Sequence, residues 1–573
     1  MFRSALRVLT LLCWWSACDD AGKPAETSPA VDSAPVDSRS ESNRDSAVTE
    51  STPPGICGDG VADLNEQCDA GTSNGSDVCG CQPDCTYAAA LIPCDDAASC
   101  PPSGACDGLG SCAAAGLSCD DGDLCTVDRC DSSTGLCTFE APVSPLDLFD
   151  HAELSDPATL DVEVLRTETM DVDGVPVTLQ ELRYTSFESD GCQLRPIRIA
   201  AWLAIPEGST PADPAPGLVI AHGIGGQAER DDVTEIAGAL PVAALAWSGP
   251  GCGASEGTAY TADHLFDLVG APPDSWFWEH TVAGVRALSV LESMPVVDST
   301  RLGMTGTSSG GIASFLAGAL DPRLTVVMPV SSAGNLDDAV RATPVPSYWA
   351  GVLESMTPPT SPDDPPWASF QLWYDPATIV GEISIDTLMI SGAQDQFFPI
   401  STVAATFAGL AAAERRLLVI RDWDHGISDY DAAAADVAVR AAQGLWLSWR
   451  WALPGAPGSA PPMPPTPAVS ACGARPACTQ IAASIDASEY TVEAVVFEWS
   501  LDGALTWSAA PLSLGAGGEW VGEVELDPEL LNASGTASML RVDYRYGDHR
   551  LSLSSEPYLA AGFVPNIPAR DAP

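Results

Sequence analysis

Six short, mostly apolar segments recur between residues 217 and 420, and they constrain the fold of this 573-residue chain more than any other feature. Helical patterns separate them. Strands that are apolar on both faces are typical of a parallel sheet covered by helices on both sides, so we expect an α/β fold. Before them, residues 176–206 alternate in polarity and predict an antiparallel hairpin. The six segments are 217–222, 242–247, 301–305, 324–329, 387–390 and 416–420.

A nucleophile motif directly follows the third segment. The sequence GTSSG at residues 306–310 fits the pattern G-x-S-x-G, and a helical pattern leaves it over residues 311–320. In a nucleophile elbow, a strand turns sharply into a helix with the serine at its apex, and small residues on either side permit the close packing. We therefore expect Ser308 to be the nucleophile.

A serine hydroxyl needs a general base near neutral pH. In this fold the base is a histidine that follows the serine and an acidic residue along the chain. Of the two histidines after Ser308, His549 belongs to the C-terminal segment, whereas His425 comes just after the last predicted strand of the sheet. Asp395, after the fifth segment, is expected to orient the imidazole. Asp424 is the rival for that role because it adjoins His425.

The first apolar segment ends in HGIGG, residues 222–226. This turn is typical of one whose backbone amide joins the amide after the nucleophile in an oxyanion hole. The expected donors are the backbone N–H groups of Ile224 and Ser309. We expect His222 to be a structural hydrogen-bonding residue of the turn.

These motifs, with GPGCGASEG at residues 249–257 and GAQD at 392–395, resemble the dienelactone hydrolase, acetyl xylan esterase and prolyl oligopeptidase group of α/β-hydrolases. They occur in family order and cover about half of the chain. The resemblance implies an α/β-hydrolase domain. Ser309 stands where acetyl xylan esterases usually carry glutamine, which argues against that subfamily, and the cysteine nucleophile of dienelactone hydrolases is absent.

The expected reaction is hydrolysis of a carboxylic ester through an acyl-serine intermediate, on a small-molecule or polymer-linked substrate. It needs no metal and no organic cofactor. The alternatives are a serine peptidase of the prolyl oligopeptidase type and a non-catalytic surface binding protein. An insertion at residues 335–380 holds five aromatic residues that would either bind substrate or simply pack a lid. They are Tyr348, Trp349, Trp367, Trp373 and Tyr374.

Thirteen of the nineteen cysteines lie between Cys57 and Cys137. Such density predicts a disulfide framework formed in an oxidising compartment, and the absence of histidine and of regular spacing argues against zinc. The stretch resembles the cysteine-rich repeats of exported myxobacterial proteins, with a second copy over residues 119–137. Its Asp and Gly residues are turn formers, although calcium binding is an alternative.

The N-terminus predicts export. Arg3 and Arg7 precede an apolar run at residues 8–15, and Ser16-Ala17-Cys18 resembles a bacterial lipobox that would make Cys18 the lipidated residue. Ordinary signal cleavage nearby is the alternative. We expect an extracytoplasmic protein of the bacterial cell envelope, either lipid-anchored or secreted.

A net charge of -53 excludes a nucleic-acid partner held through phosphates. It also argues against adsorption to anionic lipid, so membrane contact is expected only through the lipid anchor. The sequence leaves the oligomeric state open. The predicted parts are a signal peptide with lipobox (1–18), a disordered linker (19–56), a cysteine-rich module (57–140), an α/β-hydrolase domain (146–452), a Pro-rich linker (453–468) and a β-sandwich (469–573).

Overall fold

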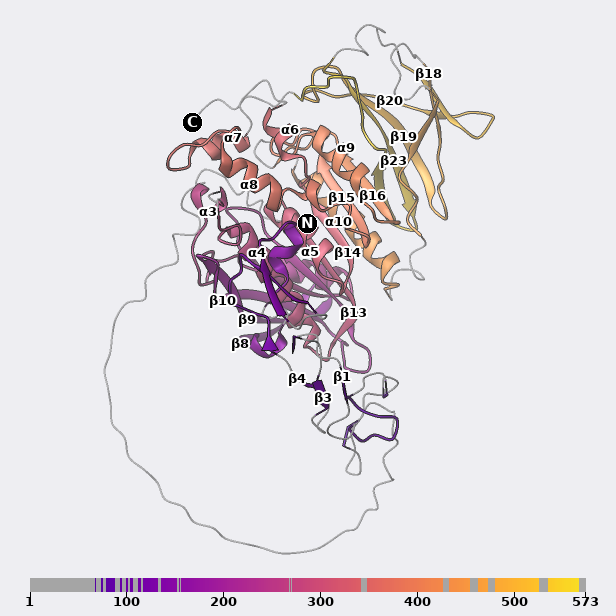
Figure 1. Cartoon of the computed structure of the whole chain (residues 1–573). Coiled ribbons are helices and arrows are strands. Elements are labelled where there is room, and N and C mark those ends of the chain that lie inside the picture. The colour runs from indigo at the N-terminus through magenta and orange to yellow at the C-terminus, as the bar shows by residue number, and fades with distance from the viewer. Residues whose placement is uncertain are drawn as a thin grey trace, which may run out of the picture. The chain divides into compact units, whose positions relative to one another are not determined.

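A computed structural model gives the arrangement of the chain (Figure 1). Two compact units divide between Ala141 and Pro142. The N-terminal unit is described at residues 67–68, 74–75, 79–87, 93–94, 99–100, 104–106, 112–114, 117–131 and 136–141. The second unit is described from 142 to 565, except at 152–153, 155, 267, 269, 342–347, 426–431, 454–461, 472–479 and 525–533.

A nine-stranded sheet forms the centre of the second unit, in the order β16-β15-β14-β13-β11-β12-β10-β9-β8. The six apolar segments form its parallel part and the predicted hairpin is β9–β10, so the α/β-hydrolase fold class is confirmed. The parallel strands are β11 (Ala215–Ala221), β12 (Ala243–Trp247), β13 (Val297–Thr307), β14 (Leu324–Val330), β15 (Asp386–Gly392) and β16 (Arg415–Ile420). The antiparallel strands are β8 (Glu163–Val172), β9 (Val175–Asp190) and β10 (Gln193–Pro206).

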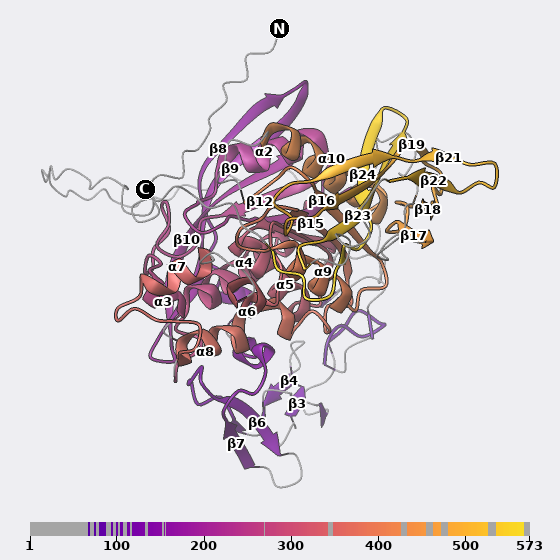
Figure 2. The same cartoon turned by 90° about the horizontal axis from the view of Figure 1, so that it is seen from above.

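Helices cover both faces of this sheet. Figure 2 shows α2 (Arg230–Ala239) and α10 (Ala432–Arg450) on one side, and α4 (Trp276–Glu292) and α5 (Ser309–Leu320) on the other. Almost every residue of α4 and α5 is buried; α5 is apolar nearly all round, whereas α4 also buries Glu279, His280 and Arg286. The other α-helices in the described part of this unit are α3 (Ala262–Phe266), α6 (Leu336–Arg341), α7 (Tyr348–Glu354), α8 (Pro365–Tyr374) and α9 (Ile400–Gly409).

The C-terminal β region, residues 468–559, consists of two antiparallel sheets, which confirms the predicted β-rich C-terminus. One sheet contains β17 (Ala468–Ala471), β18 (Gln480–Ser484), β22 (Trp520–Glu523) and β21 (Ser513–Leu514). The other contains β20 (Ser508–Pro511), β19 (Thr491–Ser500), β23 (Ala537–Tyr546), β24 (His549–Ser554) and β25 (Tyr558–Leu559). Buried residues of this region, such as Tyr544, share one hydrophobic cluster with Trp446 of α10.

The N-terminal unit contains the predicted disulfides. Cys68–Cys81, Cys79–Cys106 and Cys119–Cys137 are bonded, and β6 (Val127–Asp131) pairs with β7 (Leu136–Glu140). Short strands precede them: β1 (Pro93–Cys94), β2 (Ser99–Cys100), β3 (Gly104–Cys106), β4 (Cys112–Ala114) and β5 (Leu117–Ser118).

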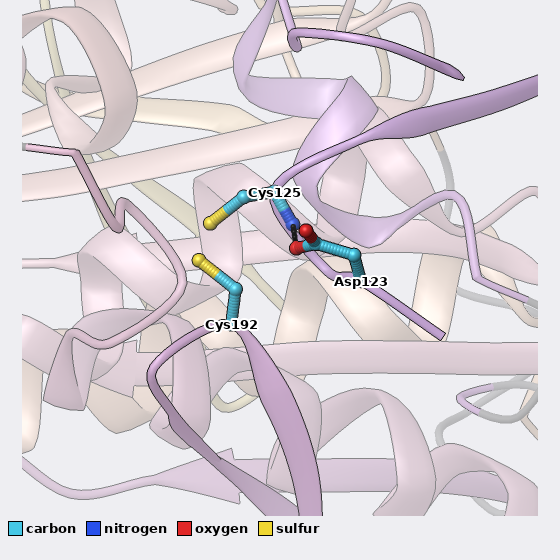
Figure 3. Close-up of side chains that lie close together, drawn as sticks. All are labelled: Asp123, Cys125 and Cys192. Carbon is cyan, nitrogen blue, oxygen red and sulfur yellow. Dashed lines mark hydrogen bonds between the residues drawn. The ribbon is translucent and has the colours of Figure 1, made fainter. Parts of the chain in front are cut away.

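Aspartate side chains of the N-terminal unit form turns. The carboxylate of Asp123 accepts a hydrogen bond from the backbone N–H of Cys125 (2.9 Å; Figure 3), and Asp120 accepts one from Gly122 (2.8 Å). These contacts are the loop chemistry that the frequent Asp and Gly residues predict.

Several predictions concern residues outside the described part of the chain: Cys18, the signal peptide and the linker at residues 19–56. Across the residues that are described, no helix is long and apolar enough to span a bilayer.

Candidate active site

Ser308 lies at the turn between β13 and α5, in a strained conformation with φ 60° and ψ −118°. Its backbone N–H donates to the carbonyl of Val330 at the end of β14 (3.0 Å). A Cβ atom at Gly306 would lie 2.4 Å from the carbonyl oxygen of Gly310, and one at Gly310 would lie 2.4 Å from that of Ala221. Both glycines of the motif are therefore required by backbone packing.

The structure brings Ser308, His425 and Asp395 together. The Nε2 atom of His425 lies 2.9 Å from the Oγ atom of Ser308, and its Nδ1 atom lies 2.8 Å from Oδ2 of Asp395. Because the carboxylate can only accept, Nδ1 carries the proton and Nε2 is left to accept from the serine hydroxyl. The three residues are far apart in sequence and meet at the carboxyl edge of the sheet.

Backbone amides also hold the Asp395 carboxylate. Its Oδ1 atom accepts hydrogen bonds from the N–H groups of Phe397 (2.9 Å) and Phe398 (2.8 Å), and Asp395 is 2% exposed. We call residues 393–399 the acid loop and residues 421–425 the histidine loop. With one oxygen fixed by its own loop, the other is directed at the imidazole of His425.

The HGIGG turn packs directly on Ser308. A hydrogen bond from the N–H of Gly226 to the carbonyl of Gly223 closes it (3.0 Å), and a Cβ atom on Gly223 would lie 3.1 Å from Cβ of Ser308. The turn does not use the N–H group of Ile224. Helix α5 begins at Ser309, whose N–H belongs to the first turn and has no acceptor within the helix. Both expected oxyanion donors thus belong to segments that meet at Ser308.

A family model described as "Acetyl xylan esterase (AXE1)" matches residues 144–435, which is half of the chain. The chain belongs to the acetyl xylan esterase family. It is accordingly a serine hydrolase of the carboxylesterase type. The expectation that Ser309, in place of the glutamine usual in acetyl xylan esterases, argues against this family was wrong. A second model, described as a Dictyostelium (slime mold) repeat, matches residues 118–141, where the second cysteine-rich repeat is predicted.

Solved structures similar to this acetyl xylan esterase family member include three esterases. The acetyl xylan esterase from Paenibacillus sp. R4 is 21% identical, with 48% of this chain and 86% of that one covered and a TM-score of 0.40. Acetyl xylan esterase 1 from Thermoanaerobacterium sp. JW/SL YS485 is 22% identical, with 46% of this chain and 83% of that one covered and a TM-score of 0.37. The glucuronoyl esterase from Solibacter usitatus is 16% identical, with 52% of this chain and 88% of that one covered and a TM-score of 0.35. No curated protein matches the chain.

In this esterase, the rival carboxylate Asp424 contacts a different residue. Its Oδ2 atom accepts a hydrogen bond from Nε2 of Gln396 (3.0 Å), and the Oε1 atom of Gln396 accepts one from the backbone N–H of His425 (3.0 Å). Gln396 thus links the acid loop to the histidine loop. Sequence reasoning missed it; the only signal is a glutamine directly after Asp395 and before the apolar pair Phe397-Phe398.

His222 is held as a neutral residue. Its Nε2 atom accepts from the N–H of Gly249 (2.8 Å) and its Nδ1 atom lies 2.7 Å from the carbonyl oxygen of Gly223. Burial lowers the pKa of His222 to about 4. These contacts match the structural role expected for it.

The aromatic residues of the insertion are mostly buried in the esterase. Trp349, Trp367, Trp373 and Tyr374 are all buried, and Nε1 of Trp349 donates to the carbonyl of Phe397 in the acid loop (2.9 Å). The rings nearest to His425 are instead those of Phe397 (4.7 Å between centroids) and Phe398 (5.6 Å), which the sequence did not single out. Tyr348 is half-buried, 5.2 Å from the Phe397 ring.

Proposed function

We propose that the chain hydrolyses carboxylic esters through an acyl-serine intermediate. Ser308 attacks the ester carbonyl, His425 takes the serine proton, and Asp395 orients His425 and stabilises the imidazolium. The observation that carries the proposal is the pair of hydrogen-bond distances, 2.9 Å from Ser308 to His425 and 2.8 Å from His425 to Asp395.

The remaining steps use the same groups. The N–H groups of Ile224 and Ser309 stabilise the negative charge on the carbonyl oxygen as the tetrahedral intermediate forms. When it collapses, the alcohol leaves with the proton from His425. A water molecule, deprotonated by His425, then attacks the acyl-enzyme, and Ser308 regains its proton as the acid departs.

The substrate we propose is an acetyl ester, on a xylan-type polysaccharide or on a small molecule. The proposal comes from the name of the matching family. The side of the catalytic imidazole that Phe397 and Phe398 cover is apolar, which suits the methyl group of a short acyl chain. A peptidase and a non-catalytic binding protein remain as outcomes of the test.

The test combines covalent labelling with a substrate panel. A fluorophosphonate probe should label the wild-type protein and not Ser308→Ala. Release of acetate from acetylated xylan and from p-nitrophenyl acetate should exceed the hydrolysis of longer p-nitrophenyl esters and of aminoacyl-nitroanilides. Preference for the anilides would support the peptidase, and a wild-type protein that is neither labelled nor active would support the binding protein.

We further propose that the protein is exported and lipidated at Cys18, with the domain boundaries given by the sequence. The basic and apolar residues before Cys18 and the disulfides of the N-terminal unit support export. In a bacterial host, the wild type should partition into the detergent phase of Triton X-114, and Cys18→Ala into the aqueous phase. Aqueous partition of both proteins would instead indicate ordinary signal cleavage.

A further inference from the structure

The C-terminal β region packs on the edge strand of the hydrolase sheet. It lies beside β16 in both views (Figure 1, Figure 2), and β24 packs against β16 and α10. The hydroxyl of Ser554 accepts from the N–H of Val419 (3.0 Å) and donates to the carbonyl of the same residue (3.1 Å). These bonds occupy backbone groups that an edge strand would otherwise leave open.

One contact of this region reaches the acid loop. Gln394, the residue before Asp395, is 7% exposed, and its Nε2 atom donates to the carbonyl oxygen of Leu505 (2.6 Å). The backbone N–H of Gln394 donates to the carbonyl of Trp423 in the histidine loop (3.1 Å). A single residue therefore connects both loops of the active site to the C-terminal β region.

The Leu505 carbonyl belongs to a loop that is well braced. The hydroxyl of Ser500 accepts from the N–H of Ala504 (2.9 Å), and the carboxylate of Asp502 accepts from the N–H of Thr506 (2.9 Å). The Thr506 hydroxyl donates to the same carboxylate (2.5 Å). Since both neighbours of Leu505 are fixed, its carbonyl is a rigid acceptor and not a mobile surface group.

A second contact reaches the histidine loop. Glu498, in β19, is 1% exposed, and its Oε1 atom lies 3.1 Å from Nε of Arg541 and 3.9 Å from Nη1 of Arg421. Arg421 is the first residue of the histidine loop. A carboxylate this deeply buried is costly unless it is paired, so the two arginines are held near it.

We propose that the C-terminal β region positions the catalytic acid and histidine, with Gln394 as the main positioning residue. The inference rests on the proposed roles of Ser308, His425 and Asp395. Displacing a catalytic group by a fraction of an ångström slows the reaction while barely changing substrate binding. The region is thus a working part of the esterase rather than an independent attachment.

The experiment uses the full chain and the variant Gln394→Met, which keeps the side chain's length and removes its donor. We expect kcat for p-nitrophenyl acetate to fall about tenfold, with KM within about twofold of the wild type. The acidic limb of the kcat/KM profile should move to lower pH, because a displaced Asp395 stabilises the imidazolium less. A purely structural loss would not move that limb.

Two further variants complete the test. Thr466→Val removes one hydrogen bond at the other end of β16, to the carbonyl of Arg415 (3.3 Å), and should leave kcat and the pH profile unchanged. Thr506→Val changes an exposed residue and removes the hydroxyl that braces the Leu505 loop. It should lower kcat, as Gln394→Met does. If Gln394→Met does not fold, the Thr506 variant decides the question. The inference would be overturned, and the proposed function would stand, if both the Gln394 and Thr506 variants kept the wild-type kcat and pH profile while Ser308→Ala was inactive. An active Ser308→Ala would overturn the proposed function itself.

Discussion

The side chain of Gln396 accepts a hydrogen bond from the backbone N–H of His425, so the residue after Asp395 holds the backbone of the histidine that contacts Ser308. The other end of its amide donates to the buried carboxylate of Asp424. A carboxylate in place of this amide would still accept from the N–H of His425. Towards Asp424, however, it would present a second negative charge instead of an N–H donor.

Gln396→Glu should therefore place two buried carboxylates about 3 Å apart. The folded variant can relieve the repulsion only by binding a proton, so a carboxyl of the pair has a folded pKa above its unfolded value. Relative to the wild type, Gln396→Glu is then least affected at low pH, and it loses stability as pH rises through that folded pKa, by about 2–4 kcal/mol at neutral pH.

Thermal melts at pH 5 and pH 8 measure this effect. Relative to the wild type, Gln396→Glu should lose more stability at pH 8 than at pH 5. Gln396→Met removes the same hydrogen bonds without adding charge, so its loss should be similar at both pH values. Parallel losses for the two variants would contradict the prediction.

Asp395 and Asp424 are distinguished by the same measurement on two matched variants. Asp395→Asn should lower kcat by about 10³–10⁴-fold, because an amide does not stabilise the imidazolium and favours the wrong tautomer of His425. Asp424→Asn keeps an oxygen that can accept from Gln396, and should lower kcat less than about tenfold. Steady-state kinetics with p-nitrophenyl acetate check the ranking, and the reverse order would assign the orienting role to Asp424.

The features that sequence predicted well depend on local constraints. The parallel strands had to be apolar on both faces, and the elbow at Ser308 needs glycines whose Cβ atoms would meet neighbouring backbone. Strand β8 was missed because it is an exposed edge strand, whose side chains alternate too weakly to give a pattern.

The features that were missed depend on tertiary contacts. Gln396 acts through hydrogen bonds to the histidine loop, and the Gln394–Leu505 contact joins residues 111 positions apart. The tryptophans of the insertion show the same limit, since composition alone does not reveal that Trp367 is fully buried. Residue type thus predicted which groups react, whereas the packing that places them required the fold.

Two buried histidines make the stability of the protein sensitive to acid. Burial lowers the pKa of His222 from 6.5 to about 4 and holds the pKa of His280, which is stacked on Trp276, well below its usual range. The unfolded chain takes up protons near pH 6.5 and the folded chain does not. The contribution of these two histidines to stability is therefore complete above about pH 7 and is lost as pH decreases from about 6.5 towards 4.

His280→Phe keeps the stacking on Trp276 and removes one of these groups. Urea denaturation at pH 7.5 and pH 5.0 should show that this variant loses less stability on acidification than the wild type. His549→Gln is the control, because that imidazole is exposed, and it should behave as the wild type. An unchanged acid loss in His280→Phe would contradict the prediction.

Replacement of glycine by alanine should have opposite effects on stability at two positions, Gly306 and Gly444. Gly306→Ala would bring a methyl group 2.4 Å from the carbonyl oxygen of Gly310, so the elbow must shift. We expect a loss of more than about 3 kcal/mol or an insoluble protein, since neither backbone segment can move without disturbing Ser308. Gly444→Ala, within helix α10, meets nothing within 4 Å and should stabilise the protein by about 0.5–1 kcal/mol. Urea denaturation checks both, and a soluble Gly306→Ala protein of wild-type stability and activity would show that the elbow tolerates a side chain there.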